Sequence, residues 1–521
     1  MRVDAPIFED KFESNPNVPG LAFRNGIKYD VGQKPSTNIL FSPRLGFNLD
    51  VFKNNKTQLR GGIGSFSGPP PFVWISNQAS NNGVQFGSFL NTVNPATGQP
   101  YVFSADINTY RPTGGENKSY NLVFTDKDFK YPQVLKTSLA VDQKLPHDFI
   151  ITAEFSYSKD LHAVNFENVN LPATGTPLAG PDNRIRYNTN RIYGSIPAAQ
   201  GGNTVANPNI SNGILMKNYS KGHSEILTLQ LQRQTPKMFY SIAYTYSKVR
   251  SLNDGGSIAA SNWRDRPVSN DPNAPELGYA NFYQPYRVIG QSSYRFAYGK
   301  NYATSVGFVF EAAPSTSGFS STGSYTYSGD VNNDGTGGNN DLIYIPRNQS
   351  EIVLVPVNTG GGTITDARTA NQMWGQLNNF INQDPYMSTH RGQVAERNSV
   401  VLPVFKHLDM NVTQDFYIQK GKTKHTLRVT FDLINVGNFV NKNWGIAQTF
   451  STPFNSSQNA ASFLKYEGLV STPGDANFGK PRYSFIYQDA TNQIPFTRSF
   501  QDNTNILSRW QGQLGIRYLF N

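Results

Sequence analysis

An Asp- and Asn-rich segment has the ligand spacing of a calcium-binding loop. It reads DVNNDGTGGNND over residues 330–341, with Gly335 at the sixth position, where such loops turn sharply. Ca²⁺ is a hard cation that takes oxygen ligands. The positions that would supply them are Asp330, Asn332, Asp334, Asp341 and the backbone carbonyl of Thr336.

Two interpretations of this loop stay open. The first is a Ca²⁺ site of the weak extracellular kind, with a Kd of about 10⁻⁴–10⁻³ M. The last ligand is Asp341 where a glutamate is usual, and strand-like residues flank the loop where helices are usual. The second is an Asx-rich turn whose carboxylates only accept hydrogen bonds from backbone amides.

Other chemistry-bearing patterns are missing from the sequence. The chain has no cysteine, so thiol catalysis and thiolate metal sites are excluded. Its 6 histidines show no HxxH or HxxxH spacing, and no Ser/His/Asp set is evident. Arg60-Gly61-Gly62 occurs without a Lys/Arg cluster, which argues against nucleic acid despite the formal charge of +10. We therefore expect neither an enzyme nor a nucleic-acid-binding protein.

The composition is polar but poor in charge. Of the 521 residues 16% are charged and 13% are aromatic, and the mean hydropathy is −0.48. Helical membrane spans are excluded, since they need about 20 consecutive apolar residues. The first residues, Met1–Pro6, lack the apolar core of a signal peptide.

Alternation of apolar and polar residues is the dominant pattern, and it predicts about eleven β-strands with two different faces. Met1–Asp4 resembles the end of one more strand. The turns predicted between paired strands are tight, at 53–56, 144–148, 234–238, 298–301 and 419–425. The connections between the pairs are long, at 67–133, 160–223, 249–285, 313–405 and 438–505.

This alternation of short and long connections predicts the fold class. A transmembrane antiparallel β-barrel has short periplasmic turns and long extracellular loops, whereas compact soluble domains rarely contain structureless loops beyond about 15 residues. The apolar face would contact lipid. The polar face would line the lumen with Arg44, Asp50, Arg60, Lys136, Asp142, Glu154, Arg295, Asp409, Asp415, Arg428, Asp432 and Arg517.

Two details of these faces can be predicted further. Asp409 and Asp415 are expected to pair with Arg428 across a hairpin, as a structural ladder. Aromatic residues at the strand ends are expected at the membrane–water interfaces; these are Phe66, Phe72, Trp74, Tyr157, Tyr246, Tyr298, Tyr302, Trp444 and Trp510. A stack of soluble antiparallel sheets remains the alternative fold.

Several segments resemble TonB-dependent outer-membrane receptors of the Oar-like group. The resemblance covers nearly the whole chain, and the most specific match is the ending Ser508–Phe520, where alternate apolar residues lead to Phe520 and a single Asn follows. The other matching segments are FSPRLGF (41–47), QLRGGIG (58–64), PPFVWISN (70–77), AYTYS (243–247), FDLINVGN (431–438) and NKNWG (441–445).

The resemblance implies a barrel of about 22 strands that is closed by an N-terminal plug domain. Residues 1–521 would then be its C-terminal portion, an open, strongly curved sheet with two unpaired edges, and the plug and signal peptide are expected to be absent. Expected partners are outer-membrane lipid and lipopolysaccharide, a surface lipoprotein, and a TonB-type energy transducer that acts through the missing plug.

The expected location is the cell outer membrane, and the expected function is uptake of a nutrient such as an oligosaccharide, peptide or chelate. Two alternatives stay open, a passive porin-like channel and a soluble β-rich glycan-binding surface protein. The sequence leaves the substrate and the ligand-contacting residues open.

Overall fold

The computed structural model describes most of the chain. The described residues are 1–8, 12–88, 93–94, 97–110, 117–118, 120–194, 210–316, 320–357 and 366–520. None of the helices in these ranges is both long and apolar enough to cross a membrane.

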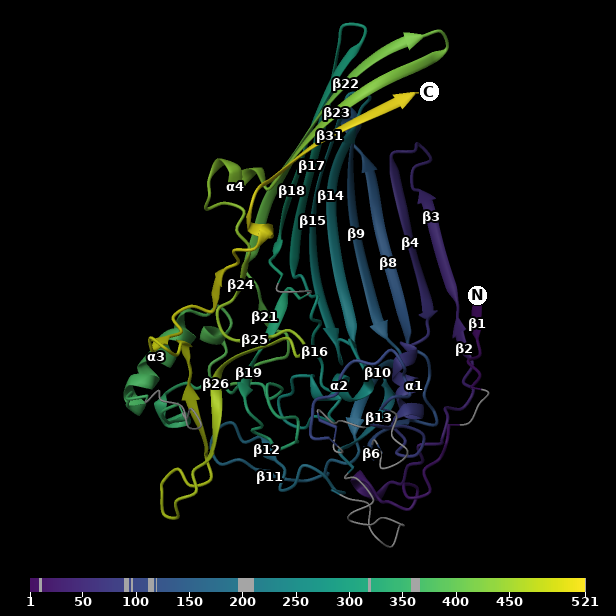
Figure 1. Ribbon diagram of the computed structural model, residues 1–521. Coiled ribbons are helices and arrows are strands. Elements are labelled where there is room, and N and C mark those ends of the chain that lie inside the picture. Colours follow the sequence, from purple (N-terminus) through teal and green to yellow (C-terminus); the bar gives the residue numbers. More distant parts are fainter. Residues whose placement is uncertain are drawn as a thin grey trace.

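One large antiparallel sheet dominates the molecule (Figure 1). Along its main path the strands are neighbours in chain order, and a short strand, β16 (Gly278–Tyr279), pairs with β15 beside the path. The path strands in the described residues are β3 (Arg44–Asp50), β4 (Thr57–Ser67), β8 (Gln133–Lys144), β9 (Phe149–Asp160), β14 (His223–Gln234), β15 (Met238–Ser251), β17 (Tyr286–Tyr298), β18 (Tyr302–Pro314), β22 (Val404–Lys420), β23 (Thr423–Ile434) and β31 (Gln511–Phe520).

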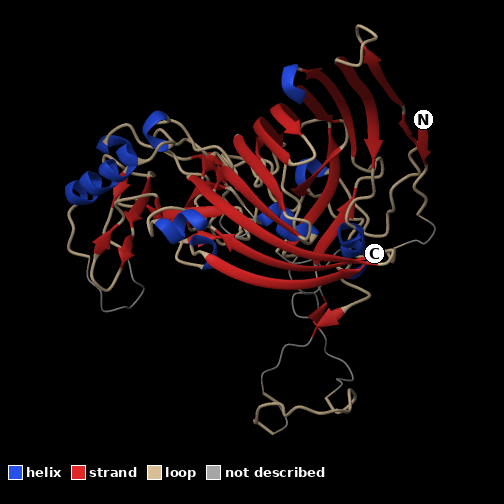
Figure 2. Ribbon diagram, turned by 90° about the horizontal axis from the view of Figure 1, so that it is seen from above, coloured by secondary structure: helices blue, strands red, loops and turns tan. Residues whose placement is uncertain are grey.

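These strands confirm the predicted succession. The short turns gather at one end of the sheet and the long connections at the other (Figure 1). Seen from above, the sheet is strongly curved (Figure 2). Within the described chain, β3 and β31 are edge strands that each pair on one side only. The predicted strand at Met1–Asp4 is also present, as β1 (Arg2–Asp4), which pairs with β2 (Leu40–Ser42).

One predicted turn is wrong. Residues 419–425 were expected to form it, but β22 and β23 remain paired as far as Lys420 opposite Thr423. Only Gly421, with a left-handed φ of 62°, and Lys422 are left between the strands. Backbone pairing does not need apolar side chains, so the hairpin continues as a polar ribbon beyond the apolar part of the sheet.

The strand register separates the two faces as predicted. Leu139 and Phe155 are direct neighbours on the apolar face, and Phe47 and Leu139 lie on either side of Gly61. A Cβ at Gly61 would lie 3.0 Å from the Phe47 ring, which covers the glycine. All of the predicted polar-face residues fall on the opposite face.

The long connections fold into lobes of their own, which the sequence did not predict. The first lobe has a small sheet in which β13 pairs with both β7 and β10. Its elements are β7 (Asn121–Thr125), β10 (Ala163–Asn168), β13 (Asn212–Tyr219), α1 (Phe72–Ser80) and α2 (Ala259–Arg264). Phe124, Phe166 and Trp263 are buried in its two apolar clusters.

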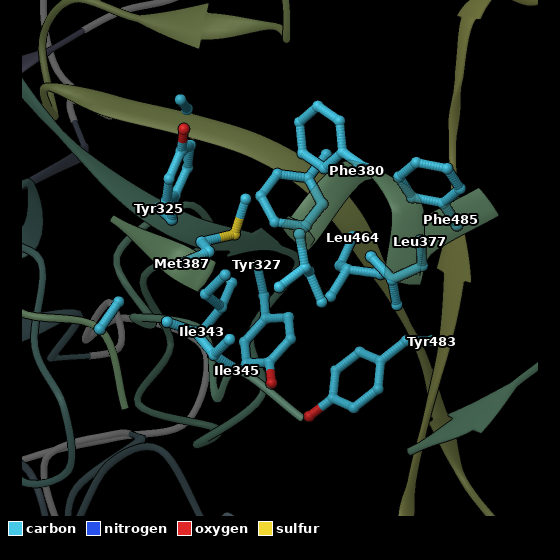
Figure 3. Close-up of a cluster of buried hydrophobic side chains, with 14 of the residues drawn as sticks. Tyr325, Tyr327, Ile343, Ile345, Leu377, Phe380, Met387, Leu464, Tyr483 and Phe485 are labelled. Atoms are coloured by element: carbon cyan, nitrogen blue, oxygen red, sulfur yellow. The ribbon is translucent and has the colours of Figure 1, made fainter. Parts of the chain in front are cut away.

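The second lobe packs a sheet against α3 (Ala370–Gln383), whose N-terminus is closed by a reciprocal capping box between Thr369 and Gln372. Figure 3 shows the core, where Phe380, Leu464 and Phe485 come from three different elements. The strands are β19 (Thr322–Ser328), β20 (Val353–Leu354), β21 (Val400–Val401), β25 (Phe454–Asn455), β26 (Ala460–Leu469) and β27 (Pro481–Phe485).

Short elements complete the connections. The strand pairs are β5 (Gly87–Ser88) with β6 (Asn117–Lys118), β11 (Thr176–Pro177) with β12 (Ile185–Arg186), β24 (Gln448–Phe450) with β30 (Phe500–Asp502), and β28 (Tyr487–Asp489) with β29 (Ile494–Pro495). A short helix, α4 (Val436–Val440), follows β23.

Two predicted interface aromatics have other positions. Trp74 is buried in the first lobe, where its indole N–H donates to the Ser257 carbonyl at 2.7 Å, because the chain folds into α1 immediately after the sheet. Phe66 lies on the polar face and packs under the Arg44 guanidinium at 4.3 Å. By contrast, Trp444 and Trp510 are exposed, as expected of interface residues.

Candidate functional site

The polar face carries two ion-pair ladders that tie neighbouring strands together. Arg60 contacts Asp142 at 3.0 Å and Glu154 at 2.9 Å, so that it links β4, β8 and β9. Further along the sheet, Asp415 accepts from Arg428 at 2.7 Å and from Arg295 at 3.1 Å. These ladders hold the face in one register while keeping it hydrophilic.

The predicted pairing with Arg428 is right for Asp415 and wrong for Asp409. Asp415 stands directly opposite Arg428, whereas Asp409 lies beyond the last β22–β23 pair, Met410 with Leu433. Asp409 instead accepts a hydrogen bond from the Asn435 backbone N–H at 2.8 Å, where the chain leaves the sheet.

We expect Asp415→Asn to lower the unfolding free energy of the sheet. The substitution leaves the guanidinium groups of Arg295 and Arg428 without their shared carboxylate, at a cost of about 1–3 kcal/mol. The unfolding free energy is measured by denaturant titration in detergent or lipid, and heat-modifiable gel migration reports the folded fraction. Asp409→Asn is the matched control, since in the described part of the chain Asp409 forms no ion pair with an arginine; equal effects of the two variants would contradict the ladder.

A cavity of about 450 Å³ lies along the polar face and reaches from β15 to β31. Its polar lining comes from four strands and includes Gln291, Asp409, Asn411, Asp432 and Gln513. Asn411 donates to Asp432 at 2.5 Å. Such a surface of amide and carboxylate groups can accept hydrogen bonds from hydroxyl or amine groups of a passing solute.

The five predicted calcium ligands lie in one loop of the second lobe. Asp330 accepts hydrogen bonds from the backbone N–H groups of Asp334, at 3.0 Å, and of Gly335, at 2.9 Å. Asp334 accepts from the Thr336 backbone N–H at 2.9 Å, and Asn332 accepts from the Asp334 N–H at 3.0 Å. The carboxylates thus tie up the loop as in an Asx-rich turn.

Asp341 has a partner that the sequence did not reveal. One of its oxygens accepts from the Val331 backbone N–H at 2.7 Å, and the other forms an ion pair with Arg184 at 3.0 Å. Arg184 comes from a distant connection, and it also contacts Asp182 at 2.9 Å. Nothing around Arg184 in the sequence distinguishes it from a surface arginine.

A calcium ion would compete with Arg184 for Asp341. Within the described residues, no group of three or more His, Cys, Asp or Glu side chains is arranged to hold a metal ion. The calcium site therefore stays a prediction, and the observed contacts are those of the alternative turn.

Burial and charge crowding change the acidity of this loop. Burial raises the pKa of Asp334 to about 6, and the neighbouring carboxylate of Asp330 adds to the effect. Burial also raises the pKa of Asp341 to about 7, although Arg184 opposes the rise. Near neutral pH the folded loop therefore holds carboxylates that are costly to ionise.

These pKa values predict that the second lobe loses stability as the pH rises. Both folded-state pKa values lie above the usual 3.8, so between about pH 4 and pH 7 the folded lobe binds protons that the unfolded lobe has released. The unfolding free energy must then fall across this range and stay low above it. Amide hydrogen exchange of β19 and α3, corrected for intrinsic rates, measures the change. Asp334→Asn should reduce the dependence of the unfolding free energy on pH. Asp475→Asn, at an exposed position in the same lobe, should leave this dependence unchanged.

Calcium is expected to reverse this loss if the loop binds it. Ca²⁺ favours the ionised carboxylates, so millimolar CaCl₂ should protect the lobe from exchange at pH 8 and have little effect at pH 5. Asp330→Ala and Asp334→Ala should each abolish the protection. An unchanged response in both variants would show that the loop is not the site.

Comparisons with known proteins identify one matching family. The family described as outer membrane beta barrel domain matches residues 9–471. No curated protein matches the chain.

Among solved structures, three similar chains are bacterial receptors or transporters. One is the ferric enterobactin receptor PfeA from Pseudomonas aeruginosa, with 9% identity over 77% of this chain and 35% of that one and a TM-score of 0.32. Another is the FrpB iron transporter from Neisseria meningitidis, with 9% identity over 79% of this chain and 36% of that one and a TM-score of 0.32. The third is the siderophore receptor PirA from Acinetobacter baumannii, with 11% identity over 79% of this chain and 38% of that one and a TM-score of 0.35. The chain spans little more than a third of the length of these structures.

Proposed function

Because the chain belongs to the outer membrane beta-barrel domain family, we propose that its sheet is the barrel portion of a TonB-dependent receptor of the Oar-like group. The sheet spans the outer membrane. The proposed role is uptake of a nutrient such as an oligosaccharide, a peptide or a chelate, with no bond-making chemistry.

The observation that carries this proposal is the folding of the long connections into two lobes at one end of the sheet. A passive channel needs an open mouth, whereas a receptor needs a folded surface that captures a scarce ligand before transport. The lobes have their own apolar cores, which give them the fixed surfaces that capture requires. The polar face of the sheet then offers a hydrophilic wall along which a released solute passes.

Barrel width supports the same proposal. Within the described residues the curved sheet leaves β3 and β31 paired on one side only, as expected of part of a wider barrel, and barrels of about 22 strands have a lumen that is plugged. We therefore propose that a plug domain completes the protein and couples it to a TonB-type energy transducer. Further proposed partners are a surface lipoprotein and lipopolysaccharide.

Transport measurements distinguish this receptor from a passive porin. Cells that express the complete protein are supplied with candidate oligosaccharides, peptides or metal chelates, in the presence and absence of the energy transducer. The receptor predicts uptake that is lost without the transducer, and no steady conductance in planar bilayers. Transducer-independent uptake with an open conducting pore would favour the porin. The sequence encoded upstream provides a separate test, because a plug domain there selects the receptor.

A further inference from the structure

A segment of the connection between β9 and β14 is fastened to the Asp- and Asn-rich loop of the second lobe. Within this segment β11 pairs antiparallel with β12. The Tyr187 backbone N–H donates to the Asn332 carbonyl at 2.8 Å, and the Asn333 side-chain amide donates to the Tyr187 carbonyl at 2.7 Å. Together with the buried ion pair of Arg184, these contacts hold the segment in one position. We call residues 176–188 the strap.

A cavity of about 470 Å³ lies between the strap and the second lobe, which is a size typical of small-molecule sites. The strap and the lobe both lie at the end of the sheet that carries the long connections (Figure 1). One part of the cavity wall is apolar, and Leu178 in this part belongs to the buried core of the second lobe. The apolar wall consists of Pro177, Leu178, Ala179, Leu469 and Gly479.

Arg186 brings a positive charge to the cavity, and no carboxylate neutralises it in the described part of the chain. Its Nη1 donates to the backbone carbonyls of Asp330, at 3.1 Å, and of Val331, which fixes one side of the guanidinium group. The guanidinium carbon lies 5.5 Å from the centroid of the Tyr466 ring. Among the described residues, Nε and Nη2 have no hydrogen-bond acceptor, and no Asp or Glu lines the cavity. A fixed guanidinium group with spare N–H groups is suited to bind a carboxylate.

Two asparagine side chains add a hydrogen-bond donor and an acceptor to the same cavity. Asn333 uses its side-chain N–H for the Tyr187 carbonyl, and its Oδ1 has no donor among the described residues. Asn188 is exposed, and its Oδ1 accepts from the Thr176 hydroxyl at 3.4 Å, so its own N–H groups face solvent. A peptide backbone offers the complementary carbonyl and N–H groups.

Other classes of solute fit this lining less well. An ammonium group would find no carboxylate among the described residues of the lining. Sugar rings pack on exposed aromatic faces. Tyr187, the aromatic residue of the described lining, is only 2% exposed, and its hydroxyl donates to Asp271 at 3.0 Å. The combination of a cation, amide groups and an apolar wall therefore favours a peptide with a free carboxylate.

We propose that this cavity binds the C-terminal residue of a peptide. The carboxylate pairs with Arg186, the backbone amide meets Asn188 and Asn333, and an apolar side chain lies against Leu178 and Leu469. This assignment rests on the proposed receptor function and narrows its nutrient to peptides with a free, apolar C-terminus.

Binding of matched peptides to the complete protein in detergent micelles tests the assignment. The probes are the dansylated tripeptide glycyl-alanyl-leucine and the same peptide with a C-terminal amide, and fluorescence anisotropy measures their Kd. The acid should bind about tenfold more tightly than the amide, because only the acid can form the charged hydrogen bonds with Arg186. Arg186→Gln should remove this preference.

A second variant avoids the contacts that Arg186 makes with the loop. Asn188→Asp adds a carboxylate at an exposed position of the cavity. It should weaken binding of the acid about tenfold by charge repulsion and leave binding of the amide unchanged. Asn443→Asp, exposed in the loop that follows α4, is the charge-matched control and should change neither Kd.

Equal affinities for the acid and the amide would overturn the proposal, since the cavity would then not recognise the carboxylate. Equal effects of Asn188→Asp and Asn443→Asp would overturn it as well, because the peptide would then bind elsewhere. Competition by decanoate as strong as that by the unlabelled acid would refute recognition of the peptide backbone. Absence of binding by both probes would refute the peptide assignment alone. The receptor function fails separately, if uptake of every nutrient proves independent of the energy transducer.

Discussion

Arg184→Leu is expected to lower the stability of the second lobe by about 3–5 kcal/mol, because it leaves two buried carboxylates without their counter-ion. Arg184, Asp182 and Asp341 have side chains that are 1%, 8% and 1% exposed. The guanidinium also donates to the Leu342 carbonyl. The measurement is amide exchange or limited proteolysis of the lobe at neutral pH.

Two controls separate the buried ion pair from general damage. Arg347→Leu removes an exposed arginine that pairs with Glu351 in the same lobe, and surface pairs of this kind contribute about 0–1 kcal/mol. Adding Asp182→Asn and Asp341→Asn to Arg184→Leu removes the uncompensated charges and should restore part of the lost stability. If the triple variant is no more stable than Arg184→Leu, the loss arises from packing and not from charge.

The strands could be predicted from sequence because each residue on a strand faces one of two different surroundings. Phe155 and Glu154 are adjacent in the chain, yet one lies on the apolar face and the other binds Arg60 on the polar face. Such alternation is local, so it identifies the strands and their succession without knowledge of any partner. The same alternation placed Asp415 and Arg428 on one face, but their direct pairing is fixed by the two-residue turn, which was predicted too long from the sequence.

The lobes could not be predicted in this way because their contacts are distant in the chain. β19 pairs in parallel with β26, which joins Ser324 to Ala460. Arg184 reaches Asp341 across 157 residues. Trp74 has the composition and position of an interface residue, and only the packing of α1 against the first lobe shows that it is buried. The calcium loop is an intermediate case. The spacing of its predicted ligands is local in the sequence, whereas Arg184, which binds Asp341, comes from a distant segment.

The assignment of the faces predicts a second large effect, at Leu229 on β14. Leu229 is exposed on the apolar face, between Ala153 and Tyr244 on the neighbouring strands. Leu229→Arg would place a guanidinium in the hydrocarbon, at a cost of about 2–4 kcal/mol near the bilayer midplane. We expect lower amounts of assembled protein in the outer membrane and a lower unfolding free energy in lipid, measured by urea titration with heat-modifiable gel migration.

Thr228→Arg is the matched control for this prediction, because the adjacent residue points to the opposite face. Thr228 lies beside Glu154 and Thr245 on the polar face, where water can solvate an added guanidinium and Glu154 can pair with it. We therefore expect a change in unfolding free energy of less than about 1 kcal/mol. If Thr228→Arg were the more destabilising variant, the assignment of the lipid and lumen faces would be reversed for the whole sheet, since a continuous register connects all of its strands. Equal, small effects would mean that neither face contacts lipid at β14.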